Sequence, residues 1–80
     1  MQNRKIKLIW DFRGPDAQAT AEHHTIHLRE FALREKLAFD TAGTEQLDDH
    51  HSIAWLHAEE AQMRMIRDAL RPQRAVLAED

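Results

Sequence analysis

The chain has only two glycines and two prolines among its 80 residues, and these residues limit where it can turn sharply. Gly14 and Pro15 stand together, Gly43 lies near the middle, and Pro72 lies near the end. Glycine permits tight turns, proline suits the first position of a helix, and a residue before proline is driven out of the α region. These three places divide the sequence into stretches whose hydrophobic periodicity can be read separately.

Residues 5–12, KIKLIWDF, alternate with a period of two, and Ile6, Leu8, Trp10 and Phe12 share one side. This alternation of β-branched and aromatic residues predicts a half-buried strand.

Residues 16–36 contain no glycine or proline, which predicts a long helix. A stripe at helical spacing is expected to face the core: Ala17, Ala21, His24, Leu28, Phe31 and Ala32. A second stripe lies on nearly the opposite side: Ala19, Ile26, Leu33 and Leu37. A helix with two apolar stripes packs between two layers or contacts a partner.

The second half predicts two more strands, a helix and a final strand. Residues 38–47 favour one irregular strand, with Phe39, Thr41 and Thr44 as strand formers and Gly43 as a bulge or turn. Residues 48–51 read as a polar loop and residues 52–58 as a clearer strand. Residues 59–71 predict a helix that Pro72 ends, and residues 74–78 a short strand. The expected inner stripe of that helix is Ala61, Met65, Ile66, Ala69 and Leu70.

The predicted order is β-α-β-β-α-β within one domain, residues 1–80. This is the ferredoxin-like split βαβ arrangement, an α+β fold. Right-handed crossovers place both helices on one face of a four-stranded antiparallel sheet. The other face stays uncovered and would carry Ile9 with either Trp55 or Leu56. Exposed apolar sheet surface on a small domain favours self-association, so we expect a homodimer.

Composition excludes several kinds of chemistry. The chain has no cysteine, which excludes disulfides, iron–sulfur clusters, thiolate zinc sites and a cysteine nucleophile. No apolar stretch approaches the roughly 20 residues that span a bilayer, and the N-terminal region lacks the apolar core of a signal peptide. We therefore expect a soluble, cytoplasmic protein with no membrane partner.

Three histidines in the first predicted helix form the cluster that is most suggestive of metal binding or catalysis. His23 and His27 are four residues apart and His24 and His27 are three apart, so adjacent helical turns bring imidazoles together. Two imidazoles could bind a divalent metal with a third ligand from Asp48, Asp49, His50 or His51. The string HHTIH differs from the zinc-protease pattern H-E-x-x-H because a histidine replaces the general base. The alternatives are structural or interfacial imidazoles, a metal site, and general acid–base catalysis.

Two further stretches are candidates for anion binding. Arg13, Gly14 and Asp16 lie where a strand end meets a helix N-terminus, and free backbone N–H groups there can hold an anion. Arg64, Arg67 and Arg71 form a basic stripe on the second helix that Arg74 would extend. Ordinary turn chemistry and a solvated helix face are the simpler explanations of the same residues.

Nucleic-acid binding is disfavoured by the sequence. RNA-binding modules with this strand order stack bases on aromatic residues of the first and third strands, where Trp10, Phe12 and Trp55 lie. The third strand, SIAWLHA, lacks the basic, glycine-rich signature of those modules, and the formal net charge is −3. We expect these aromatics to form core or dimer interface instead.

The stretches WDFRGPDAQATAEHHTIHLREF and HHSIAWLHAEEAQMRMIRDALRP resemble a group of small, uncharacterised bacterial proteins of about this length. That resemblance implies no activity and transfers no functional residue. At the level of the fold, the strand order is similar to that of amino-acid-sensing ACT domains and dimeric α+β barrel enzymes, whose ligand motifs do not occur here.

The leading hypothesis from sequence is a homodimeric interaction or small-ligand-binding module that has no cofactor. The alternative is a small enzyme or metal-binding protein that uses His23, His24 and His27 with the 48–51 loop and Arg13.

Overall fold

The computed structural model describes residues 4–38 and 41–78 and has the predicted order of elements. The elements are strand β1 (Lys5–Arg13), helix α1 (Ala17–Arg34), strands β2 (Ala42–Asp48) and β3 (His51–Glu59), a 3₁₀ turn (Glu60–Gln62), helix α2 (Met63–Leu70) and strand β4 (Arg74–Leu77). All strand pairs are antiparallel, and the order in the sheet is β2-β3-β1-β4. The ferredoxin-like α+β fold is therefore confirmed.

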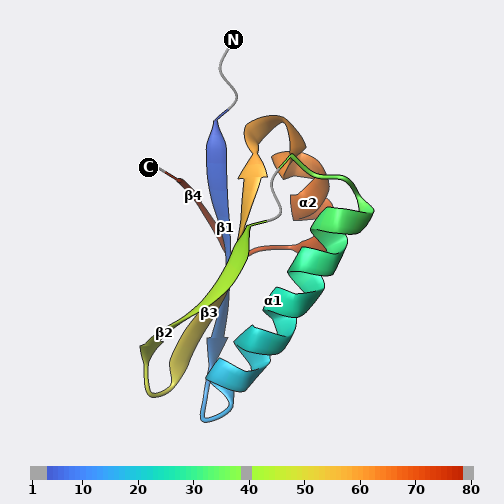
Figure 1. The fold of residues 1–80 in the computed structure, drawn as a ribbon. Coiled ribbons are helices and arrows are strands. Elements are labelled where there is room, and N and C mark those ends of the chain that lie inside the picture. The colour runs from blue at the N-terminus through green and yellow to red at the C-terminus, as the bar shows by residue number, and fades with distance from the viewer. Residues whose placement is uncertain (1–3, 39–40, 79–80) are drawn as a thin grey trace.

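Both helices lie on the same side of the twisted sheet, and the longer α1 runs along it (Figure 1). The core between the layers contains Ile6, Leu8 and Trp10 of β1, Leu28 of α1 and Ile66 of α2. Alanines on β3 and α1 that have no exposed surface let the helix approach the sheet closely: Ala21, Ala54 and Ala58. Such close approach of small residues gives dense packing in a small core.

The predicted core face of α1 is confirmed at five positions, and the sixth predicted residue, His24, is only half-buried. Ala17, Ala21, Leu28, Phe31 and Ala32 are buried as expected, and so is Thr25. The Thr25 hydroxyl oxygen lies 2.9 Å from the carbonyl oxygen of Ala21, 3.0 Å from that of Gly43 and 2.6 Å from the Thr44 hydroxyl. These contacts satisfy a buried hydroxyl and fasten α1 to β2.

The second half differs from prediction in its details. The strand predicted at residues 38–47 begins at Ala42, and its irregularity lies between Gln46 and Asp48 instead of at Gly43; Phe39 lies outside the described residues. The second helix begins at Met63 because a 3₁₀ turn precedes it.

That later start changes which residues of α2 face inward. Ile66 is fully buried and Met63 and Leu70 pack against the core. Met65 is 42% exposed, and Ala61 and Ala69 are also exposed, so the predicted inner stripe was wrong at these three positions.

Tight backbone turns precede α1 and follow α2, and hydrogen bonds fix both turns to the rest of the fold. Gly14 has a φ of 109°, and its N–H donates to the carbonyl of His50 at 2.8 Å, which joins the β1–α1 turn to the β2–β3 turn. Arg71 ends α2 in the left-handed region, and the indole N–H of Trp10 donates to the carbonyl of Leu70 at 2.8 Å. Trp10 therefore satisfies a helix-end carbonyl from inside the core.

Candidate functional site

The face of the sheet opposite the helices is the first candidate site, and we call it the open face. Antiparallel partners share a face, and alternate residues of a strand point to opposite faces, so the register defines its members. They are Lys5, Lys7, Ile9, Asp11 and Arg13 of β1, His51, Ile53, Trp55, His57 and Glu59 of β3, Gly43 and Glu45 of β2, and Arg74 and Val76 of β4.

An apolar group of Ile9, Ile53, Trp55 and Val76 spans three neighbouring levels in the middle of the open face. Ile9 and Ile53 are only 5% and 4% exposed although no helix covers them, and Val76 is 45% exposed. Trp55 lies flat on Gly43, because a Cβ atom built on that glycine would be 2.5 Å from Cζ2 of the indole. Gly43 therefore matters because its missing side chain leaves room for the Trp55 ring, and not because the chain turns there.

Polar side chains hold the indole from one side. The Nζ atom of Lys7 lies 5.1 Å from the Trp55 ring, within the range of a cation–π contact, and the His57 ring centroid lies 4.8 Å from it. The large aromatic surface of Trp55 is thus kept in one orientation on the open face.

A polar cluster of Asp11, His51 and Arg74 lies on the same face. The Asp11 carboxylate accepts a hydrogen bond from Nε of Arg74 at 3.0 Å and another from Nη2 at 2.9 Å, and Nε2 of His51 lies 2.8 Å from Oδ1. Partial burial raises the pKa of Asp11, but the hydrogen bonds and charges of His51 and Arg74 outweigh it and lower the pKa overall.

The Asp11 cluster was missed from the sequence because its members are far apart in the chain. The signal that could have found it is the β1–β3 register, which places an acidic residue in an apolar strand beside the start of β3. The Asp11 carboxylate is saturated by a bidentate arginine, and the cluster contains no nucleophile. Its evident role is to attach β4 to β1, since the Asp11 backbone N–H also donates to Oε1 of Gln73 at 3.1 Å.

The three histidines of α1 do not act as one group. His24 turns toward the sheet, with ring centroids 5.2 Å from Trp10 and 5.5 Å from Phe12, and its buried Nε2 has no hydrogen-bond partner among the described residues. Burial lowers the pKa of His24, and the neighbouring His27 and His23 lower it further. His24 is thus a half-buried imidazole kept neutral by its surroundings.

His23 and His27 turn away from the sheet. Their Nε2 atoms lie 3.1 Å apart, and Nδ1 of His27 lies 3.2 Å from a carboxylate oxygen of Glu30. His50 lies in the β2–β3 turn and His51 contacts Asp11, so neither joins the helical pair. Among the described residues, no three histidine or carboxylate side chains come close enough to hold a metal ion together.

The candidate anion sites do not converge either. The Gly14 N–H is already bonded to a carbonyl, and Asp16 at the start of α1 makes no side-chain cap. Arg13 at the end of β1, Arg64 in α2 and Arg71 at the C-cap of α2 are all solvent-exposed. Two other arginines have acidic neighbours: Nε of Arg67 lies 3.3 Å from Asp68, and Arg74 binds Asp11.

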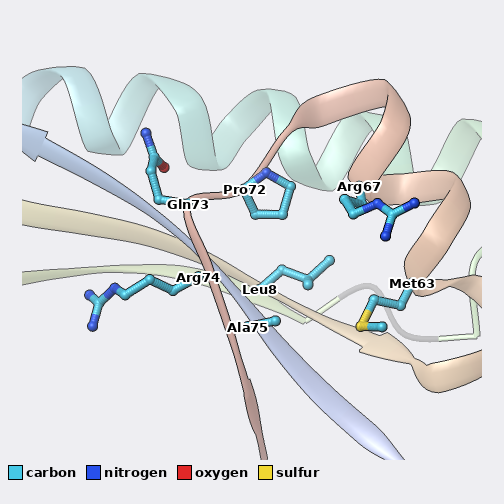
Figure 2. Close-up of a pocket in the computed structure, with 7 residues that line it drawn as sticks. All are labelled: Leu8, Met63, Arg67, Pro72, Gln73, Arg74 and Ala75. Carbon is cyan, nitrogen blue, oxygen red and sulfur yellow. The ribbon is translucent and has the colours of Figure 1, made fainter.

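A small cavity of about 210 Å³ lies between α2 and β4 (Figure 2). Its lining is Leu8, Met63, Arg67, Pro72, Gln73, Arg74 and Ala75. Its volume lies below the roughly 300–1,000 Å³ of typical small-molecule pockets. The cavity therefore does not single out a ligand.

Comparison with protein-family models, with curated protein sequences and with solved structures gives no match to this chain. None of the helices described in residues 4–38 and 41–78 is long and apolar enough to cross a membrane.

Proposed function

We propose that the protein is an interaction module that forms a homodimer by pairing the open faces of two copies, and that it acts in the cytoplasm. The observation that carries this proposal is the apolar surface of half-buried Trp55 and exposed Val76, over buried Ile9 and Ile53, on the side of the sheet that no helix covers. Large aromatic residues held in one orientation are typical of interface centres, since little side-chain entropy is lost when they are covered.

The charges on either side of this apolar group support a second copy as the occupant. Lys7 lies two residues before Ile9 on β1, and Asp11 lies two residues after it, level with Glu45, so each is the next residue of β1 on the open face. A two-fold axis that runs across the strands at the level of Ile9 and Trp55 lays each strand over itself, and it places Lys7 opposite Asp11 of the partner copy. The same patch is then self-complementary in charge, as an isologous interface requires.

The size of the face indicates a weak dimer. Four strands about 4.8 Å apart and roughly 25 Å of strand length give on the order of 500 Å² per copy, near the lower limit for a specific interface. We therefore expect a dissociation constant in the micromolar range.

The open face supports a protein partner better than a nucleic acid. Trp10 belongs to the core and Phe12 packs against it, so of the three aromatics considered for base stacking only Trp55 lies on the open face. Glu45, Asp11 and Glu59 lie on that face beside its cations, which opposes binding of a phosphate backbone.

Adjacent residues of β4 offer a matched test. Val76 is 45% exposed on the open face, and Leu77 is 52% exposed on the side of the helices. Val76→Glu places a charge in the proposed interface, whereas Leu77→Glu places the same charge outside it. Sedimentation velocity from micromolar to hundreds of micromolar should show a monomer–dimer equilibrium for the wild type and Leu77→Glu, and a monomer for Val76→Glu.

A wild-type monomer at the highest concentration refutes the proposed dimer. A dimer that survives Val76→Glu, or that both substitutions abolish equally, places the contact elsewhere. Cell fractionation of the full chain tests the cytoplasmic location separately, and recovery in a membrane or extracellular fraction contradicts it.

A further inference from the structure

We infer that His23 and His27 form an exposed two-nitrogen site for a divalent transition metal ion, with Glu30 as its supporting carboxylate. The site lies on the outward side of α1, away from the open face, and does not depend on the proposed dimer. Four-residue spacing on a helix places the two rings on adjacent turns, with centroids 4.6 Å apart and planes at 79°.

The separation of the two nitrogens fits one metal ion. Imidazole nitrogens lie about 2.0–2.1 Å from zinc, and ligand angles of about 90–109° at the ion then place two nitrogens about 2.9–3.4 Å apart. The Nε2 atoms of His23 and His27 are 3.1 Å apart, inside this interval. One ion can therefore bind both nitrogens after the rings turn so that their lone pairs converge on it.

Glu30 prepares His27 for this role. Oε1 of Glu30 lies 3.2 Å from Nδ1 of His27, so an Nδ1–H proton is held by the carboxylate and the Nε2 lone pair is left available. A carboxylate behind a ligating histidine fixes its tautomer and increases its basicity. His23 then donates its Nε2–H to Nε2 of His27 in the metal-free pair.

Binding a metal needs a change of tautomer at His23 and a rotation of the rings. Moving its proton from Nε2 to Nδ1 frees the second lone pair without loss of a proton from the pair. Water leaves the ion as the two metal–nitrogen bonds form, and the remaining coordination positions keep water because the side chains of His27 and Glu30 are 58% and 64% exposed.

The ligand set decides which ions fit. Imidazole nitrogens suit Zn²⁺, Ni²⁺ and Cu²⁺, whereas Mg²⁺ and Ca²⁺ prefer oxygen ligands. No third histidine or carboxylate ligand converges with the pair in the described part of the chain. The site therefore binds reversibly, and copper should bind more tightly than nickel or zinc in the usual order of affinities.

Calorimetric titration of the full, untagged chain with Ni²⁺ tests the site. The wild type should bind one ion per chain, and His23→Ala or His27→Ala should weaken binding at least ten-fold. Glu30→Gln should weaken it about ten-fold, because a supporting carboxylate contributes on the order of 10–100-fold to metal affinity. His50→Ala is the matched control, since it removes an exposed histidine outside the pair and should leave affinity unchanged.

A thermal melt gives an independent readout. Nickel should raise the melting temperature of the wild type and of His50→Ala, since an ion that links adjacent turns stabilises the folded helix. It should leave that of His23→Ala unchanged, with circular dichroism confirming that each variant is folded. Equal binding by His23→Ala and the wild type, loss of binding in His50→Ala, or no binding at millimolar Ni²⁺ each overturns the inference.

Discussion

The contact between Gly43 and Trp55 provides the sharpest test of the packing on the open face. Gly43→Ala places a Cβ atom 2.5 Å from Cζ2 and 2.8 Å from Cε2 of the indole. Carbon atoms in contact are normally about 3.5–4.0 Å apart, so the ring must move outward by about 1 Å. The substitution therefore tests whether the indole lies directly on the backbone of β2.

Two opposing effects determine the size of the change. Overpacking destabilises by about 1–3 kcal/mol, and a cost of about 1.5 kcal/mol applies because the half-buried Trp55 can tilt toward solvent. Alanine in a strand is more favourable than glycine by about 0.5–1 kcal/mol, since the unfolded chain loses less freedom. The free energy of unfolding should therefore fall by about 0.5–1 kcal/mol.

Urea denaturation followed by far-UV circular dichroism measures this change. With a slope of about 1 kcal/mol/M for a small domain, the midpoint should fall by about 0.5–1 M. Repeating Gly43→Ala in a Trp55→Ala background removes the clash and leaves only the backbone effect, so the substitution should then be stabilising. The reasoning is refuted if Gly43→Ala stabilises the wild type or has the same effect in both backgrounds.

Two other predictions concern polar groups that contact the sheet. Asp11→Asn should lower stability at pH 7 by about 1–2 kcal/mol, because Arg74 and His51 lose a charged acceptor in a partly exposed site. Since the pKa of Asp11 is lowered in the folded state, the stabilisation that its carboxylate provides is present above the unfolded pKa of 3.8 and is lost as the pH falls through the folded pKa. The free energy of unfolding, measured against pH in the acid range, should therefore change less for Asp11→Asn than for the wild type. Parallel pH profiles of the two proteins would contradict this. His24→Leu should raise the free energy of unfolding by about 1 kcal/mol, because it removes a buried nitrogen that has no hydrogen-bond partner among the described residues. The matched change His23→Leu, at an exposed position, should have almost no effect. Thermal melts compare the two variants, and a lower melting temperature for His24→Leu than for the wild type would contradict the prediction.

The order of elements could be predicted because the hydrophobic period changes clearly along the chain. The alternation at residues 5–12 and the glycine-free stretch after Pro15 correspond closely to β1 and α1. The start of α2 was missed because residues 60–62 form a 3₁₀ turn, whose hydrogen bonds close over three residues and shift the phase of the inward face.

The candidate sites depended on contacts that periodicity does not encode. Helical spacing correctly places His23 and His27 side by side. It cannot tell whether residues 48–51 supply a third ligand, and none converges with the pair among the described residues. The contacts of Asp11 with His51 and of Asp11 with Arg74 join residues 40 and 63 positions apart, and they follow only from the strand register. The burial of Thr25 was not predicted, since two of the three oxygens that its hydroxyl contacts belong to β2.

The exposed strand β4 has a consequence for the surface beside it. All four of its residues are solvent-exposed, and it pairs with β1 alone, from the opposite end of the chain. It should therefore be the first strand to detach in local opening, well below the free energy of global unfolding. Detachment removes Val76 and Arg74 from the open face and uncovers one edge of β1 (Figure 1). The width of the open face is thus set by a local equilibrium at the C-terminal strand, and a partner that bound across β4, as we propose, would also hold that strand in place.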